Sequence, residues 1–142
     1  LRKELNKKDL LNYIIIQVIS GLMAVISVHY IFQIELFQIS TNIRGEIPLL
    51  ISEIIATFGL VLTILLIRKN DEKSVAMGVA LFITAGYWFT SSTSFANPAV
   101  TISRVFTDTF TGIAPESLLY FICGQIVGCI IANYTFNIFD KK

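Results

Sequence analysis

Between two long apolar segments lies Ser94-Phe95-Ala96-Asn97-Pro98-Ala99-Val100-Thr101-Ile102-Ser103-Arg104, a short interruption with one proline and several polar residues. Its Asn97-Pro98-Ala99 portion predicts a helix start, because Asn is a favoured N-cap and Pro is favoured at the first helical position. A helix that starts inside a membrane protein directs a positive helix end and an amide side chain into a cavity. We therefore expect a half-helix over about residues 97–107 that enters the bilayer without crossing it.

The composition is that of a membrane protein. Of the 142 residues, 54% are hydrophobic and 15% are charged, whereas a soluble domain carries about 25% charged residues. A spanning helix needs about 20 mostly apolar residues, and four runs have or approach that length: 10–32, 47–67, 75–89 and 117–139. We predict an all-α membrane protein: one transmembrane domain over 1–142, with four transmembrane helices and one re-entrant half-helix.

The distribution of basic residues predicts the topology. Most of the 11 Lys and Arg residues lie before the first span, between the second and third spans, or after the last span. By the positive-inside rule this side is cytoplasmic. We therefore expect a multi-pass protein of the plasma membrane with both termini in the cytoplasm and the Asn-Pro-Ala loop entering from outside. Basic residues that flank spans do not form a nucleic-acid surface, so no such partner is expected.

The chain lacks the side-chain groupings of metal sites and enzymes. It has one His and two Cys without close spacing, so we expect no metal site and no cofactor. Nucleophile–base pairs, carboxylate pairs and phosphate-binding loops are also missing from the sequence, which argues against an enzyme. His29, near the end of the first span, is expected to be an interfacial residue and not a ligand or proton relay.

The Asn97-Pro98-Ala99 stretch resembles the second Asn-Pro-Ala box of the aquaporin (major intrinsic protein) family of water and small-solute channels. Glu53, followed by Thr57-Phe58, is similar to the Glu and Thr-Phe pattern that opens each family repeat. The resemblance implies that Glu53 is buried and braces the loop that carries the box. Gln17 and Gln125 occupy corresponding positions in the weakly similar first and last spans, and we expect both to be structural buried polar residues.

The family fold has two repeats of three spans, each with a half-helix between its second and third spans. By this resemblance, residues 10–32 are the third span of repeat one and residues 46–139 are a complete repeat two. The first two spans and the first box are absent from this sequence. We therefore expect the chain to be inactive alone, as a piece of a longer protein or a split or degenerate member. The resemblance implies a homotetramer at full length.

The resemblance also assigns roles in the pore. Asn97 would donate its side-chain amide to a passing solute, Pro98 would fix the helix entry, and Ala99 would pack against the partner half-helix. The positive end of the half-helix would repel cations and protons.

The selectivity filter of the family maps by ungapped spacing to Ala85, Ser94 and Val100, with Thr84 as the alternative to Ala85 one residue earlier. The family usually has an arginine where this chain has Val100. Arg104 lies one turn further on, and the sequence does not show whether it replaces the missing arginine.

A filter of small, uncharged residues predicts a wider pore than one that passes water alone. We expect the intact protein to pass water and small neutral solutes larger than water, such as glycerol-like polyols or neutral metalloid hydroxides such as arsenous acid. The later stretches Thr107-Asp108-Thr109-Phe110 and Gly112-Ile113-Ala114-Pro115 resemble a bacterial subgroup linked with arsenic resistance.

Three other interpretations stay open at this point. A secondary transporter with a broken helix also uses a helix end at mid-membrane, with Glu53 as the candidate ionisable group within the spans. A non-conducting membrane scaffold fits Gly124 and Gly128, which permit close helix packing. The segment after Asn97 can also be an interfacial helix that never enters the bilayer.

Overall fold

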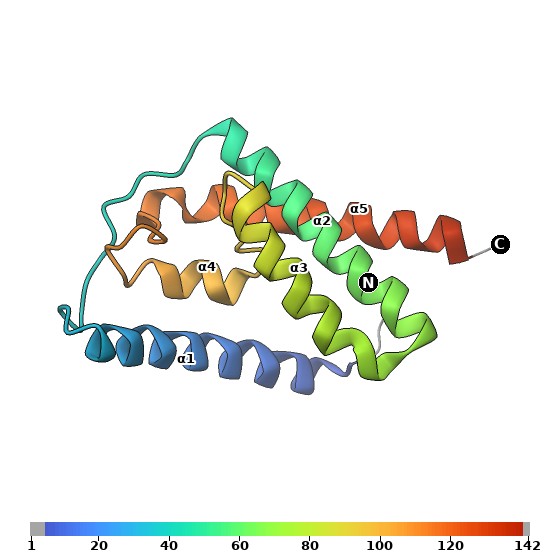
Figure 1. Ribbon diagram of the computed structural model, residues 1–142, viewed down its shortest axis with the longest axis horizontal. Coiled ribbons are helices and arrows are strands. Elements are labelled where there is room, and N and C mark those ends of the chain that lie inside the picture. Colours follow the sequence, from blue (N-terminus) through green and yellow to red (C-terminus); the bar gives the residue numbers. More distant parts are fainter. Residues whose placement is uncertain (1–4, 141–142) are drawn as a thin grey trace. The chain divides into compact units, whose positions relative to one another are not determined.

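The computed structural model describes residues 5–140, and every regular element in that range is helical (Figure 1). The long helices are α1 (Lys7–Ile31), α2 (Ile47–Asn70), α3 (Val75–Phe89) and α5 (Leu118–Asp140), with the short helix α4 (Pro98–Arg104) between the last two. Two 3-10 turns, η1 (Glu72–Ser74) and η2 (Pro115–Ser117), precede α3 and α5. The prediction of an all-α fold is confirmed for these residues.

Three described helical segments are long and apolar enough to cross a membrane: Lys7–Ile31, Ile47–Asn70 and Pro115–Asp140. The fourth expected span, α3, has 15 residues, or about 22 Å of helix against a hydrocarbon core of about 30 Å. It ends there because Thr90 caps it, with its N–H and its hydroxyl both donating to the carbonyl of Gly86. The four expected apolar runs are thus found as three long helices and one short one, and the short one is the run 75–89 that only approached the length of a span.

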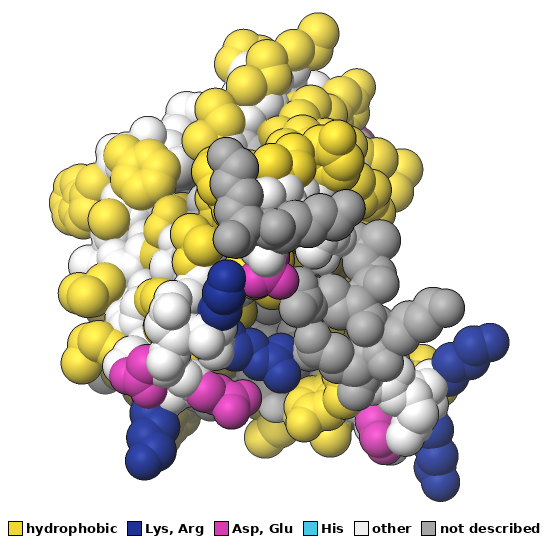
Figure 2. Space-filling view, turned by 90° about the vertical axis from the view of Figure 1, so that its right-hand side faces the viewer, with side chains coloured by type: hydrophobic (Ala, Val, Ile, Leu, Met, Phe, Trp, Pro, Cys, Tyr) yellow, Lys and Arg dark blue, Asp and Glu magenta, His cyan; other side chains and the backbone are white. Residues whose placement is uncertain are grey.

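Much of the apolar surface of these helices is exposed, as a bilayer environment requires. Only 6% of the most apolar stretch of α1 is buried, and large side chains such as Met23, Met77 and Trp88 are exposed. Figure 2 shows hydrophobic side chains over much of the face that it presents. Soluble monomers rarely expose contiguous apolar patches larger than a few hundred Å², so the exposed surface agrees with the membrane composition.

The chain divides into two compact units. The first unit contains residues 5–44 and 98–118, and the second contains residues 45–97 and 119–140. The boundary within the motif stretch falls between Asn97 and Pro98. Each unit is described by itself below.

In the first unit, α1 packs along α4, and Gly21 permits the close approach. A Cβ atom at Gly21 would overlap the hydroxyl oxygen of Ser103. The segment after α1 is held against the segment after α4 by backbone hydrogen bonds. The Ser40 N–H donates to the Val105 carbonyl at 2.8 Å, and the Ala114 N–H donates to the Asn42 carbonyl at 2.8 Å.

The half-helix expected over about 97–107 is shorter in the structure, where α4 ends at Arg104. After Arg104 the backbone forms a turn that is tighter than an α-helix, because the N–H groups of Val105 and Phe106 donate to carbonyls three residues earlier. The carbonyls of Arg104 and Val105 accept hydrogen bonds from Ile113 and Ser40, which lie elsewhere in the sequence. These partners take up the backbone groups that a longer helix would use internally.

In the second unit, α2 and α3 form a helical hairpin joined by η1 (Figure 1). Its apolar core contains Ala56 and Leu60 from α2 and Ala96 from the loop before α4. Helix α5 approaches α2 closely through its glycines, since a Cβ atom at Gly128 would lie 2.5 Å from the Ile54 carbonyl oxygen. Small residues at such contacts allow helix backbones to meet in a membrane protein.

Candidate functional site

The segment between α3 and α4, residues 90–97, is a buried loop in an unusual conformation. Its residues 92–96 are all buried. Thr93, Ser94 and Ala96 have positive φ angles of 61°, 50° and 48°. Left-handed conformations at non-glycine residues cost on the order of 1–3 kcal/mol each, and they persist only where the surroundings hold them. The loop therefore needs strong anchors.

Glu53 on α2 is the principal anchor. Its Oε1 accepts hydrogen bonds from the Ser92 hydroxyl at 2.7 Å and from the Phe95 N–H at 3.0 Å. Its Oε2 accepts from the Ala96 N–H at 3.0 Å and from Gln125 Nε2 at 2.7 Å. The side chain is completely buried. Four donors around two oxygens match an ionised carboxylate, which is an acceptor only, and they offset the cost of burying its charge.

Further contacts support the same loop. The Ser92 N–H donates to the Ser52 hydroxyl at 3.1 Å, and the ring of Phe95 lies 5.0 Å from the ring of Phe121 on α5. Glu53 and Gln125, both predicted to be buried and polar, therefore meet directly beneath a loop that α2 and α5 hold from two sides. Gln17, which is also predicted to be buried, is exposed among the described residues. It lies on α1, most of whose apolar stretch is unburied.

The depth of the loop follows from the position of its anchor. Glu53 lies about 9 Å along the axis from the first residue of α2, and Gln125 lies about 10 Å from the start of α5. Both helices are candidate membrane spans. A loop bonded to these two side chains lies at the same level along the helices, well inside their ends. Irregular backbone at such depth is tolerated where protein buries it or where it lines a water-filled cavity.

The Asn-Pro-Ala residues follow this loop directly. Asn97 is half-buried and precedes α4, which Pro98 opens as its first residue. Ala99 is buried and Val100 is half-buried.

The other two predicted filter residues belong to the second unit. Ala85 is exposed on α3, whereas Ser94 is buried in the loop. The Ser94 side chain packs on Gly86, where a Cβ atom would lie 2.7 Å from its hydroxyl oxygen. This oxygen has no hydrogen-bond partner among the described residues. Buried hydroxyls usually have one, so Ser94 retains the capacity to bind a water molecule or solute.

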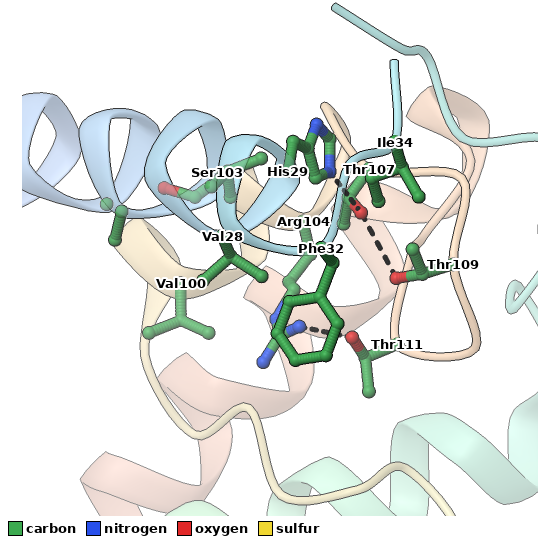
Figure 3. Close-up of a pocket in the computed structure, with 13 residues that line it drawn as sticks. Val28, His29, Phe32, Ile34, Val100, Ser103, Arg104, Thr107, Thr109 and Thr111 are labelled. Atoms are coloured by element: carbon green, nitrogen blue, oxygen red, sulfur yellow. Dashed lines mark hydrogen bonds between the residues drawn. The ribbon is translucent and has the colours of Figure 1, made fainter. Parts of the chain in front are cut away.

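Val100 lines a cavity of about 590 Å³ within the first unit. One wall is mostly apolar and comes from α1 and the residue that follows it, including Val25, Val28 and Phe32. The other wall is richer in polar groups and comes from α4 and the segment after it (Figure 3); its polar members are Ser103, Arg104, Thr107, Thr109 and Thr111.

The polar groups of this cavity are linked to one another. His29 Nε2 lies 2.8 Å from the Thr107 hydroxyl, which lies 3.1 Å from the Thr109 hydroxyl. Arg104 Nη1 donates a hydrogen bond to the Thr111 hydroxyl (Figure 3). His29, which is expected near the membrane interface, lies in the last turn of α1 and is only 1% exposed. Thr107 and the carbonyl of Leu36 bind its two ring nitrogens.

The stretch that resembles the bacterial subgroup includes Thr107 and Thr109 but implies no role for them, and Thr111 lies outside it. The bend and turn over residues 109–111 decide that Thr111 lines the same cavity as Thr107 and Thr109, and no spacing in the sequence indicates such a turn. Nothing in the described residues forms a group of three or more side chains able to hold a metal ion.

Comparison with known proteins finds a relative whose sequence matches most of this chain. It is 40% identical over 128 residues to aquaglyceroporin AqpS of Rhizobium meliloti (strain 1021). The match covers 90% of this chain and 55% of the relative, so the chain spans about half the length of the curated protein that it matches. No family model matches the chain, and no solved structure matches it. The match thus confirms the resemblance seen in the motifs and supports the view that this chain is part of a protein of the aquaporin (major intrinsic protein) family.

Proposed function

We propose that the protein containing this chain is a passive transmembrane channel for water and small uncharged solutes. The observation that carries the proposal is the strained loop at membrane depth, which Glu53 anchors and which leads into Asn97 and α4. Such a loop is costly, and a polar conduction path is a reason for a membrane protein to keep it. The similarity to an aquaglyceroporin supports the same function. The proposal is of a channel and not of an enzyme.

In this channel, Asn97 donates its side-chain amide to the oxygen of a passing solute, and Pro98 and Ala99 set the start of α4. Ser94 contributes a buried hydroxyl whose hydrogen-bonding capacity is not used within the described residues. Hydrogen bonds of this kind replace those that a solute leaves behind in water, so the solute passes without a chemical reaction.

The proposed solutes are glycerol-like polyols and neutral metalloid hydroxides such as arsenous acid. Val100 stands where an arginine is usual in the family, and Ala85 and Ser94 are also small. Small uncharged side chains leave room for solutes larger than water. The relative that the chain matches is an aquaglyceroporin, which agrees with this solute class.

The geometry of Glu53 argues against a coupled transporter. A coupling group must gain and lose a proton or ion during each cycle. Glu53 is fully buried, and each of its oxygens accepts two hydrogen bonds. These four bonds hold the loop that leads to Asn97, so the Glu53 carboxyl group serves the loop and is not open to a coupling ion.

The glycines of α5 argue against a scaffold. Their close contacts are made within the second unit, where Gly124 faces the Leu50 carbonyl and Gly128 faces the Ile54 carbonyl. This small-residue surface is therefore covered by α2 and does not serve a partner helix.

We further propose that the protein lies in the plasma membrane with cytoplasmic termini and assembles as a homotetramer. We also propose that the 142 residues alone conduct nothing, because the pore of the family needs two opposed half-helices. The functional test therefore uses the full-length protein encoded by the gene, and separately the 142-residue chain.

The experiment is a stopped-flow flux measurement on vesicles that contain the full-length protein. We expect water, glycerol and arsenous acid to pass without saturation and without a proton gradient. Substitution of Val100→Arg should narrow the path and lower glycerol flux on the order of tenfold while water flux falls less. Val100→Ala is the matched control and should retain glycerol flux.

Three results would reject this function. Passage of water with exclusion of both larger solutes would refute the solute class. Saturable flux driven by a proton gradient would indicate a transporter. Full-length protein that passes neither water nor solutes would indicate a scaffold.

A further inference from the structure

The loop between α3 and α4 has a second anchor on α2, next to Glu53. The hydroxyl of Ser52 makes two hydrogen bonds to the same loop residue, Ser92. It accepts from the Ser92 N–H at 3.1 Å and donates to the Ser92 hydroxyl at 3.2 Å. Both residues are buried, and Ser92 is completely so. One hydroxyl of α2 therefore fixes both the backbone and the side chain of Ser92.

The Ser92 hydroxyl extends this restraint further along the loop. It donates to Glu53 Oε1 at 2.7 Å and accepts from the Ser94 N–H at 3.3 Å. A hydroxyl has one donor hydrogen and two acceptor lone pairs, so the bonds from Ser52 and Ser94 fill its two acceptor positions. The orientation of the Ser92 side chain thus depends on Ser52, and the backbone of Ser94 depends on that orientation.

Ser94 consequently lies between two points that α2 holds. Before it, Ser92 is held by Ser52; after it, the N–H groups of the next two residues are held by Glu53. Thr93 and Ser94 have φ angles of 61° and 50°, and left-handed conformations of this kind persist only where the surroundings hold them. Glu53 accounts for the later point, and Ser52 accounts for the earlier one.

We propose that Ser52 is a positioning residue of the solute path, which acts through Ser92 to set the place of the Ser94 hydroxyl. Without the Ser52 hydroxyl, the Ser92 N–H loses this acceptor, while the Ser92 side chain keeps its bond to Glu53. The chain before Ser94 is then held less firmly, and Ser94 shifts from its seat on Gly86. The inference rests on the proposed function, in which Ser94 lines the path.

The first test measures the position of residue 94 by the reactivity of a thiol placed there. It uses full-length protein in which Cys123 and Cys129 are replaced by Ser, together with any cysteine outside this chain. Ser94→Cys then introduces the reporter, whose rate of modification by the small neutral reagent methyl methanethiosulfonate is measured in vesicles. Ser94 is 3% exposed, so the reporter should react slowly while the loop keeps its shape.

Ser52→Ala should raise this rate about fivefold, as expected for the loss of one hydrogen bond. Ser52→Thr keeps the hydroxyl and should retain the slow rate. The matched control is Thr57→Val, which removes a buried hydroxyl of α2 that has no hydrogen-bond partner among the described residues; it should leave the rate unchanged. An unchanged rate in Ser52→Ala, or an equal rise in Ser52→Ala and Ser52→Thr, would overturn the proposal.

The second test measures the ratio of glycerol flux to water flux in vesicles that contain full-length protein with Ser94 in place. A loss of folded channels lowers both fluxes by the same factor, so the ratio responds to the shape of the path. Ser52→Ala should lower the ratio several-fold, because glycerol is larger and touches more of the wall than water does. Ser52→Thr and Thr57→Val should retain the ratio. A ratio that Ser52→Ala leaves unchanged would also overturn the proposal.

Hydrogen exchange in the protein that keeps Ser52 decides the matter if Ser52→Ala does not fold. The amide of buried Ser92 should exchange more slowly than the amide of exposed Ser91, and equal exchange would overturn the proposal. A thiol rate that depends on Ser52 in a protein that passes neither water nor glycerol would refute the channel function alone. Glycerol flux with a thiol rate and a flux ratio independent of Ser52 would refute only the role of Ser52.

Discussion

Replacing Glu53 with Gln is the sharpest perturbation of the loop that carries Asn97. The substitution keeps the size of the side chain but turns one acceptor oxygen into an NH₂ donor. In the structure all four neighbours of the carboxylate are donors, and two of them are the backbone N–H groups of Phe95 and Ala96. Ser92 can rotate its hydroxyl and Gln125 can turn its amide over, but a backbone N–H cannot become an acceptor.

Either orientation of the introduced amide therefore leaves one buried N–H without its partner. With the NH₂ group at the Oε1 position the orphan is Phe95, and at the Oε2 position it is Ala96. An unsatisfied buried donor costs about 1–3 kcal/mol. The remaining hydrogen bonds also lose their charge assistance, while removal of a buried charge offsets part of that loss. We expect Glu53→Gln to lower the free energy of unfolding by about 2 kcal/mol.

The assay is unfolding of the detergent-solubilised protein in mixed micelles with increasing dodecyl sulfate, followed by circular dichroism. Glu46→Gln is the matched control, because Glu46 is exposed and makes no side-chain capping bond at the start of α2; its effect should stay within about 0.5 kcal/mol. Equal stability of the two variants would show that Glu53 does not hold the loop.

Two other substitutions test the packing of each unit by the same assay. Gly128→Ala should lower the free energy of unfolding by about 1–3 kcal/mol, because the new Cβ would lie 2.5 Å from a backbone oxygen of α2. Gly59→Ala is the control and should lower it less, because its Cβ meets the side-chain ring of Phe82. A larger loss for Gly59→Ala would contradict the α2–α5 contact. Thr107→Val should lower the free energy of unfolding by about 1–2 kcal/mol, because it removes the buried hydrogen-bond partner of His29. Thr109→Val is the control at an exposed position and should lower it by less than about 0.5 kcal/mol. Equal losses would exclude a structural role for the His29 bond.

Hydropathy and motif chemistry predicted the fold class because both depend on short stretches of sequence. A run of apolar residues forms a helix in a bilayer wherever it occurs, since its backbone hydrogen bonds are internal. The apolar run 75–89 became α3 with the same bounds, although its length falls short of a full span. Proline at position 98 likewise marked the first residue of α4, because its missing N–H is tolerated there.

Helix ends and side-chain burial were less predictable, because they depend on residues far away in the sequence. The helix expected to reach residue 107 stops at Arg104, where Ile113 and Ser40 bind the final carbonyls. His29 is buried through Thr107, which lies 78 positions later. Gln17 is exposed on α1 among the described residues, and its predicted burial, which rests on similarity to Gln125, stays a prediction.

The sequence by itself determined the membrane character, the helical runs and the Asn-Pro-Ala box, because composition and local propensity are properties of contiguous residues. Only the tertiary structure decided which groups surround the Glu53 carboxylate and how the strained loop is held at depth. It also decided that Arg104 shares a cavity wall with Val100, His29 and the threonines. These are contacts between segments brought together by packing, whose distances no pattern along the chain specifies.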